Sequence, residues 1–198
     1  MITIGVTGHR ILAELEKIEA GVEKALDFIE NAYPDQPLAV MSQIADGADR
    51  MVAKAVLSRP GARLIVHLPM PLADYETDFE TEESKIEFRK LMSQASEVSE
   101  LPPVESRNMA YEAAGVFILD HCDVLMTIWD GQGAQGQGGT GEIVSLARQR
   151  GLPIAWIHAG NRKPGTLEPT SLGDQQGMVT FEDFPVSSLG TSFPSSIC

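Results

Sequence analysis

One short apolar run constrains the fold more than any other stretch of the chain. Residues 124–129 are apolar except for Thr127, which is the pattern of a strand buried on both faces. A glycine-rich loop, residues 131–139, follows, and a helical pattern begins at Thr140. Such an arrangement forms a cradle for an anion, because unpaired amide groups and the positive end of the helix dipole point at the loop. We expect a phosphate there; a flexible connection without a ligand is the alternative.

The loop matches neither of two common nucleotide motifs. Its spacing is not that of G-x-G-x-x-G followed by an acid on the next strand, which would indicate a dinucleotide site. It is not G-x-x-x-x-G-K-[ST] either, because no Lys precedes Thr140. We therefore expect neither NAD binding nor ATP hydrolysis, and no cofactor.

Strand and helix patterns alternate along most of the chain. Apolar strand patterns occupy residues 2–7, 38–41, 64–68, 124–129 and 153–158. Helical patterns occupy residues 11–32, the segment from the polar loop 42–50 to residue 57, part of the acidic segment 74–100, and residues 109–119 and 140–150. This alternation predicts an α/β fold with one doubly wound, mostly parallel sheet and helices on both faces. Ligands of such sheets lie at the carboxyl ends of the strands, so the polar loops after the first, second and fourth predicted strands should converge on one crevice.

Two further expectations concern the acidic segment and the end of the chain. Ile86 and Leu91, with Phe88 as a further candidate, are expected on the inner face of the acidic helix. Residues 1–159 are expected to form the single α/β domain. Residues 160–198, rich in Pro, Gly and Ser, are expected to be an extended or partly disordered tail that wraps the domain or a partner.

The charge balance argues against nucleic acid as a partner. The chain of 198 residues has 15 Lys and Arg against 28 Asp and Glu, a net charge of −13, and no basic cluster. Binding of polyanions depends on neutralising phosphates, so we expect no nucleic acid partner. A small nucleotide held by backbone amides and one or two arginines is compatible with this charge.

Other classes of function and location are excluded on simpler grounds. No basic and apolar leader and no apolar run of membrane-spanning length occurs, so we expect a cytoplasmic protein without membrane contact. Two cysteines give no disulfide framework, and the histidines have no metal-ligand spacing, so no metal site is expected.

The turn after the first predicted strand supplies the first candidate ligand contacts. Arg10 can bind a phosphate bidentately, and Gly8 lets the backbone approach a ligand closely. His9 can donate to a phosphate or carry a proton. A helix-capping arginine and a packed histidine are the structural alternative.

Two more groups follow the second and fourth predicted strands. Ser42, Gly47 and Asp49 form one group, in which Ser42 can bind ribose or phosphate and Asp49 can cap the next helix. Glu142 lies in the first turn of a helix and Asp130 lies across the glycine loop. Two carboxylates flanking a sugar are used in glycosidic chemistry, so these are the candidate catalytic residues; a simple N-terminal helix acid is the alternative for Glu142.

Four motifs together resemble the SLOG superfamily, named for the DNA-processing Smf proteins and the cytokinin-activating LOG phosphoribohydrolases. They are Gly5-Val6-Thr7-Gly8-His9-Arg10, Ser42-x-x-Ala45-x-Gly47-Ala48-Asp49-Arg50, Leu68-Pro69-Met70-Pro71 with Tyr75-x-x-Asp78-Phe79, and the stretch from Asp123 to Glu142. The resemblance covers residues 1–159 and implies a Rossmann-like domain that binds nucleotides or nucleotide-derived signals. It also implies a phosphate site at Gly138, Gly139 and Thr140, helped by Gly8 and Arg10, with Glu142 near the ribose. Related domains often pair, which leaves a homodimer open.

One departure from the family pattern bears on catalysis. The LOG signature P-G-G-x-G-T-x-x-E, aligned on Gly139 and Thr140, places Ile143 at the position of the catalytic Glu. Glu142 is one residue early, which rotates it by about 100° around a helix. The sequence therefore favours a binding domain for a nucleotide-like small molecule. An N-glycosidic hydrolase acting on a nucleoside monophosphate and a protein-interaction module that uses the acidic helix and the tail are the alternatives.

Overall fold

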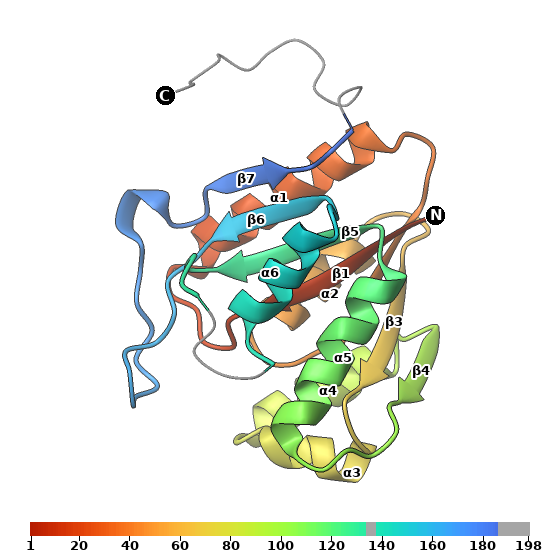
Figure 1. The fold of residues 1–198 in the computed structure, drawn as a ribbon, viewed down its shortest axis with the longest axis vertical. Helices are drawn as coiled ribbons and strands as arrows, with labels where there is room; N and C mark the ends of the chain where they lie inside the picture. Colours follow the sequence, from red (N-terminus) through yellow and green to blue (C-terminus); the bar gives the residue numbers. More distant parts are fainter. Residues whose placement is uncertain (134–137, 186–198) are drawn as a thin grey trace.

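A single sheet of seven strands runs through the centre of the molecule in the order β4-β3-β2-β1-β5-β6-β7 (Figure 1). The computed structural model describes residues 1–133 and 138–185. The strands are β1 Ile2–Gly8, β2 Leu38–Ser42, β3 Arg63–Leu68, β4 Glu97–Glu100, β5 Val124–Trp129, β6 Ile154–His158 and β7 Val179–Glu182. Neighbouring strands pair in parallel except β6 and β7, which are antiparallel.

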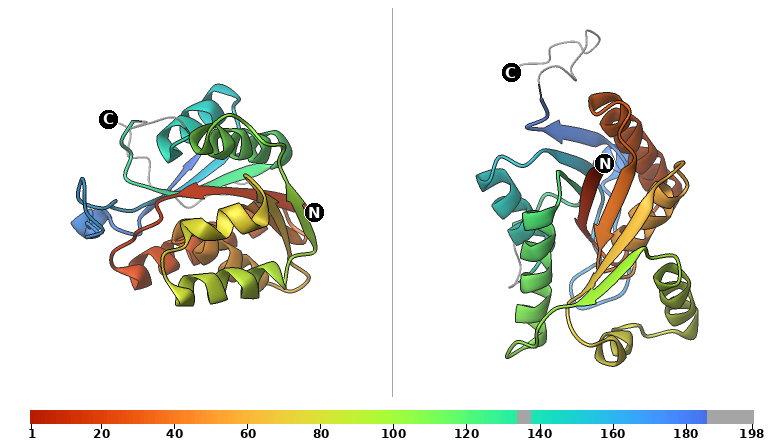
Figure 2. Two further views of the ribbon diagram at one scale, coloured as in Figure 1. Left: turned by 90° about the horizontal axis from the view of Figure 1, so that it is seen from below. Right: turned by 90° about the vertical axis from the view of Figure 1, so that its right-hand side faces the viewer.

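Helices cover both faces of this sheet. They are α1 Leu15–Ala32, α2 Ala48–Leu57, α3 Leu72–Tyr75, α4 Glu82–Met92, α5 Arg107–His121 and α6 Thr140–Gln149, with short 3-10 turns η1 Glu76–Asp78 and η2 Gly173–Gln175. Figure 2 shows α5 and α6 on one face and α1, α2 and α4 on the other. The predicted doubly wound α/β fold is therefore confirmed. Among the described residues, no helix has both the length and the apolar character needed to cross a membrane.

The apolar runs of the sequence become the strands that are buried on both faces. Every residue of β2 and of β5 is buried. The amphipathic pattern of α1 places Ile18, Val22 and Leu26 against the sheet with at most 1% exposed, because residues three and four apart share one face of a helix. Burial of these faces is the main force that holds the layers together.

The chain changes direction at the centre of the sheet. It builds β1 to β4 toward one edge, then returns through α5 to place β5 beside β1, and continues through β6 and β7 to the other edge. The loops after β1 and β5 therefore leave in opposite directions. Such a point, at the carboxyl ends of two neighbouring strands, leaves room for a ligand.

One inner-face prediction for the acidic helix is wrong. Phe88 and Leu91 in α4 are buried, whereas Ile86 is 61% exposed. Residues two apart on a helix lie about 200° apart, so Ile86 and Phe88 cannot both face the core.

Both edge strands were absent from the sequence prediction. β4 is fully exposed and carries two glutamates, so it has no apolar run, yet it pairs with β3 through Ile65 and Glu97. β7 pairs with β6 through Val179 and Ile157, and Phe181 stacks on Phe28 of α1 at 3.8 Å between ring centroids. The structure thus places part of the predicted tail in the sheet. The boundary at residue 159 stays a prediction, and residues 186–198 lie outside the described part of the chain.

Gly47 allows the start of α2 to pack against the turn after β1. Its φ is +77°, and a Cβ atom there would lie 2.4 Å from the carbonyl oxygen of Arg10 and 2.5 Å from that of His9. These contacts are with backbone atoms, which cannot move aside cheaply. Only glycine therefore fits at this position.

We expect Gly47→Ala to lower the free energy of unfolding by at least about 3 kcal/mol, since it combines backbone strain with a steric clash. Gly61→Ala is the matched control, because Gly61 also has a positive φ of +73° but has no atom within 4 Å of the point that a Cβ would occupy. The control should cost only about 1 kcal/mol. Urea denaturation of both variants measures the difference, and equal losses would contradict the role given to the close approach.

Candidate functional site

A cavity of about 770 Å³ opens at the carboxyl ends of β1 and β5. Its walls come from the loops after β1, β2, β5 and β6, from one side of α5 and from the first turn of α6. The sequence-predicted residues that line it are Gly8, His9, Arg10, Asp49, Asp130, Gly138, Gly139 and Thr140. Ser42, Gly47 and Glu142 are not on its walls. The polar loops thus converge on one crevice, as the order of the elements predicts.

His9 connects three elements at the base of this cavity. Its backbone N donates to Ile128 O of β5 and its carbonyl accepts from Ala48 N of α2, both at 3.0 Å. Its side-chain Nε2 accepts from the amide N of Asp130 at 3.1 Å. Burial lowers the pKa of His9, while attraction to the Asp130 carboxylate opposes this. The neutral imidazole therefore accepts a backbone hydrogen bond, and its Nε2 is not placed to donate to a phosphate as the sequence had suggested.

Gly8 lines the cavity, but packing also requires a glycine there. A Cβ atom at this position would lie 2.5 Å from the Cβ of Ala48 and 2.7 Å from Ile128 O. The absence of a side chain therefore serves the approach of α2 and β5 to β1. Close approach of a ligand is not needed to explain it.

The second predicted group is a buried hydrogen-bonded pair. Ser42 Oγ donates to Asp49 Oδ2 at 2.7 Å and accepts from Ile44 N at 2.8 Å. Ser42 is fully buried and lies behind Asp49, whose carboxylate also accepts from Ala45 N at 3.4 Å. Burial raises the pKa of Asp49, and the hydrogen bond from Ser42 opposes the shift. Ser42 thus supports Asp49, which is the member of the pair that reaches the cavity.

The described end of the glycine loop and the start of α6 form part of the cavity wall. Gly138 N donates to Glu142 Oε2 at 2.7 Å, and Gly139 O accepts from Glu142 N and Ile143 N. Within the described residues the amides of Thr140 and Gly141, both on the wall, have no hydrogen-bond partner. The remainder of the predicted loop, residues 134–137, lies outside the described residues.

The carboxylates of both candidate catalytic residues accept hydrogen bonds from backbone amides of the loop. Glu142 accepts from Gly138 N, and Asp130 Oδ1 accepts from Gln132 N at 3.0 Å. Ile143, which stands where LOG hydrolases have their catalytic Glu, is 3% exposed and packs near Gly115 of α5. A catalytic role for Glu142 and Asp130 stays a prediction.

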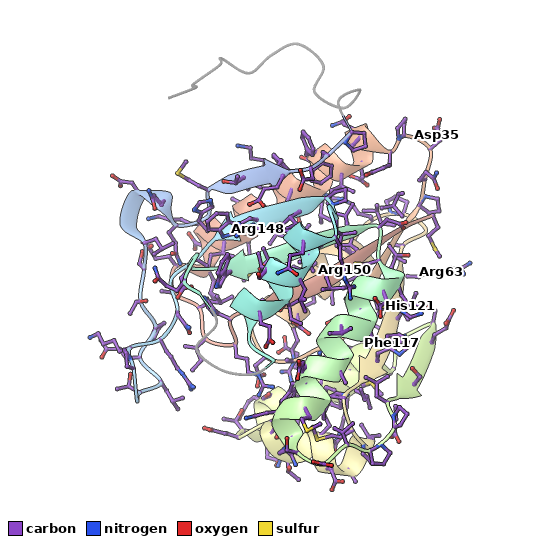
Figure 3. The ribbon with its side chains drawn as sticks, viewed as in Figure 1. Asp35, Arg63, Phe117, His121, Arg148 and Arg150 are labelled. Carbon is purple, nitrogen blue, oxygen red and sulfur yellow. The ribbon has the colours of Figure 1, made fainter. Side chains whose placement is uncertain are left out.

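Two exposed arginines on the cavity walls, Arg10 and Arg162, form no ion pair with any residue that the structure describes. Arg10 lies over the ring of Tyr111 in α5, with its Cζ 5.2 Å from the ring centroid. Arg162 lies in the loop after β6. Most other Lys and Arg side chains are ion-paired; within residues 1–133 and 138–185 the exceptions are Arg10, Lys24, Arg63, Lys90 and Arg162. Figure 3 labels Arg63, which stands at the start of β3, at the amino end of the strand, and also the ion-paired Arg148 and Arg150 of α6 and the turn after it.

Several lining residues were missed from the sequence. Asn108, Tyr111 and Gly115 of α5 line the cavity at spacings of three and four, so they share one side of the helix. That spacing was visible in the sequence, but nothing there showed which side faced the crevice. Arg162 was missed because residues 160–198 were assigned to the tail. The described residues contain no group of three or more His, Cys, Asp or Glu side chains that could hold a metal ion.

Comparison with known proteins identifies a structural relative. No family model and no curated protein matches the chain. Among solved structures it is similar to DNA processing protein A from Helicobacter pylori, whose structure was described for its single-stranded DNA binding mode. The TM-score is 0.54 at 15% sequence identity, over 89% of this chain and 69% of that chain. This likeness supports the Rossmann-like fold.

The comparison corrects two expectations. The sequence led us to expect a small nucleotide as the ligand and to exclude nucleic acid, and a structural relative that binds single-stranded DNA overturns both. The hydrolase alternative gains no support from it. The physical error was to use the net charge, which sums the whole surface, as a guide to one cavity.

The effect of burying the Asp49 carboxylate can be tested by measuring the stability of the chain as a function of pH. Because burial raises its pKa, the folded chain binds the proton more tightly than the unfolded chain, and the free energy of unfolding falls as the pH rises through the folded-state pKa. Asp49→Asn removes this penalty. We expect its stability relative to the parent chain to rise by about 1 kcal/mol between about pH 4 and pH 8.

Urea denaturation across that pH range measures this effect. The control is Asp174→Asn, at an exposed position in η2. It should show no such pH-dependent gain. A difference between Asp49→Asn and the parent chain that does not change with pH would refute the buried-charge explanation.

Proposed function

We propose that this chain binds single-stranded nucleic acid, with the phosphate backbone in the cavity at the carboxyl edge of the sheet. The observation that carries the proposal is the distribution of unpaired cations. The cavity has Arg10 and Arg162 on its walls, whereas ion pairs occupy most of the basic side chains elsewhere. An arginine without an ion pair can bind a phosphate bidentately without first losing a protein partner.

The acids of the cavity weaken this positive charge less than their number suggests. Asp49 has a raised pKa and accepts hydrogen bonds from Ser42 and Ala45, and Asp130 is directed at His9 and Gln132. The remaining negative charges of the chain act from a distance. At physiological ionic strength charges farther away than about 8 Å are largely screened, so a net charge of −13 does not forbid a local phosphate site.

Two further features of the walls suit a single strand. Tyr111 lines the cavity with the Arg10 guanidinium over its ring, and stacking of bases on aromatic rings and on arginine is how many proteins hold unpaired strands without reading their sequence. The amides of Thr140 and Gly141 at the start of α6 add hydrogen-bond donors for phosphate oxygens. An acidic chain with two phosphate-binding arginines should bind weakly and with a small salt dependence.

We also infer that the chain is a member of the SLOG superfamily and acts in the cytoplasm. The four sequence motifs and the likeness in fold to DNA processing protein A support the first inference. The second rests on the expectations from the sequence given above.

The test is fluorescence anisotropy with a labelled single-stranded DNA of mixed sequence. We expect Arg10→Gln to weaken binding roughly tenfold and Arg162→Gln to act in the same direction, since each removes a charge-assisted hydrogen bond. Each variant should also reduce the slope of log K against log salt by about 0.7 between about 50 and 200 mM salt. Arg63→Gln is the matched control, because Arg63 is an unpaired, exposed arginine far along β3 from the cavity edge.

The control separates a local site from general charge. If Arg63→Gln weakened binding as much as Arg10→Gln, the binding would be non-specific. If the parent chain bound no single-stranded DNA or RNA even at low salt, the proposal would be wrong.

Tyr111 provides a second test that leaves the charge of the cavity unchanged. Tyr111→Leu should lose about 1 to 3 kcal/mol of binding free energy, which is the scale of one stacked base, and Tyr111→Phe should retain most of it. The same anisotropy titration measures both variants, with thermal unfolding to verify that each is folded. Equal affinity of the Leu and Phe variants would show that no base stacks there.

A further inference from the structure

The imidazole of His9 is turned toward the protein backbone. Its exposed fraction is 9%, and its Nε2 accepts the 3.1 Å hydrogen bond from the amide N of Asp130. A backbone amide can only donate, so Nε2 carries no proton in this arrangement. The ring is therefore neutral, with its proton on Nδ1.

Asp130 is the first residue of a short segment, residues 130–133, that we call the 130–133 wall of the cavity. Asp130 Oδ1 accepts from Gln132 N at 3.0 Å, and Gly131 between them has a φ of +78°. Gln132 and Gly133 line the cavity. Within the described residues two hydrogen bonds fix the course of this wall, one to the His9 ring and one to the Asp130 carboxylate.

Charged groups reach this region from each neighbouring element. Arg10 follows His9 in the same loop, Asp49 lies in the first turn of α2, and Asp130 follows β5. Asp49 is engaged with Ser42, and Arg10 lies over Tyr111. Of these three groups, Asp130 is the one that pairs with the ring, with its Oδ1 at 3.4 Å from Nε2.

We propose that neutral His9 is the positioning residue for the 130–133 wall, and that uptake of a proton at its Nε2 releases this wall from its place in the cavity. A protonated Nε2 is a donor and cannot accept from Asp130 N. It is instead drawn to Asp130 Oδ1, which then competes with the hydrogen bond from Gln132 N. One proton therefore weakens both hydrogen bonds that set the wall.

The direction of the pH effect follows from the surroundings of the ring. Burial lowers the pKa of His9 and Asp130 opposes this, so the neutral form holds the wall at neutral pH and is lost on acidification below about pH 6.5. The new positive charge lies against Asp130, which neutralises it, so it adds little attraction for phosphate. Resting on the proposed function, we expect single-stranded nucleic acid to bind more weakly at acidic pH.

The first test uses the free protein and needs no nucleic acid. NMR spectra of the ¹⁵N-labelled chain follow the His9 ring nitrogens and the amides of Asp130 and Gly133 through the acidic range. We expect an unprotonated Nε2 at neutral pH, and amide shifts of Asp130 and Gly133 that change with the same midpoint as the ring. A proton on Nε2 at neutral pH, or amides that ignore the titration of the ring, would overturn the inference.

The second test measures binding of single-stranded DNA as a function of pH. His9→Gln keeps an acceptor that does not titrate, so the ratio of its affinities at neutral and acidic pH should lack the extra loss on acidification, which we expect to be roughly fivefold in the parent chain. His158→Gln is the control, because His158 lies in β6 with its Nε2 on Thr180 Oγ1. The control should keep the full pH response.

The two tests distinguish a failure of the proposed function from a failure of the positioning role of His9. If no oligonucleotide binds, the proposed function is wrong, while coupled titration of His9 and Asp130 would still support the positioning role. If DNA binds and His9→Gln keeps the parent pH response, the positioning role is wrong and the proposed function stands.

Discussion

The close meeting of β1, β5 and α2 is the constraint on which the cavity depends. Gly8 and Gly47 remove the side chains that would keep these elements apart, and the backbone of His9 then bonds to both Ile128 and Ala48. Because these contacts are between backbone atoms, the turn after β1 has little freedom. Arg10, the next residue, is thereby held at the edge of the sheet, where its guanidinium lies over Tyr111. Packing deep in the sheet thus determines where the exposed cation stands.

The central part of the fold could be predicted from the sequence because buried apolar residues recur with the period of the strand or helix that contains them. Residues 124–129 and the apolar face of α1 had to be apolar to lie inside, so their patterns predicted the strand and the helix. The edge strands leave a much weaker signal. Glu97 and Glu100 of β4 are exposed, and in β7 only Val179 and Phe181 pack against the core, each partly buried. The positions of the strand ends led to Arg10 and Asp49, which both line the cavity, and their role as ligand contacts stays a prediction. The sequence could not show that Ser42 lies behind Asp49, nor that Tyr111 and Arg162 reach the same cavity, because these are facts of side-chain direction.

The net charge of the chain is a poor guide to the charges around the cavity. Ion pairs absorb most of the basic side chains on the surface, and the acids in excess are spread along α4, β4 and the loops. Arg10 and Arg162 both lie on the walls of the cavity at the carboxyl edge. For the single strand that we propose as the partner, this arrangement would limit contact to a short stretch of phosphates, since a longer strand would have to cross acidic surface.

The antiparallel strand β7 has a consequence for how the protein is made. Phe28 of α1 packs against Phe181 and Phe184, which are separated from it by most of the chain. During synthesis on the ribosome, α1 emerges early, and its aromatic side remains open until residues 179–184 follow. A nascent chain that stalls before β7 therefore exposes this aromatic surface, which is the kind of surface that chaperones bind.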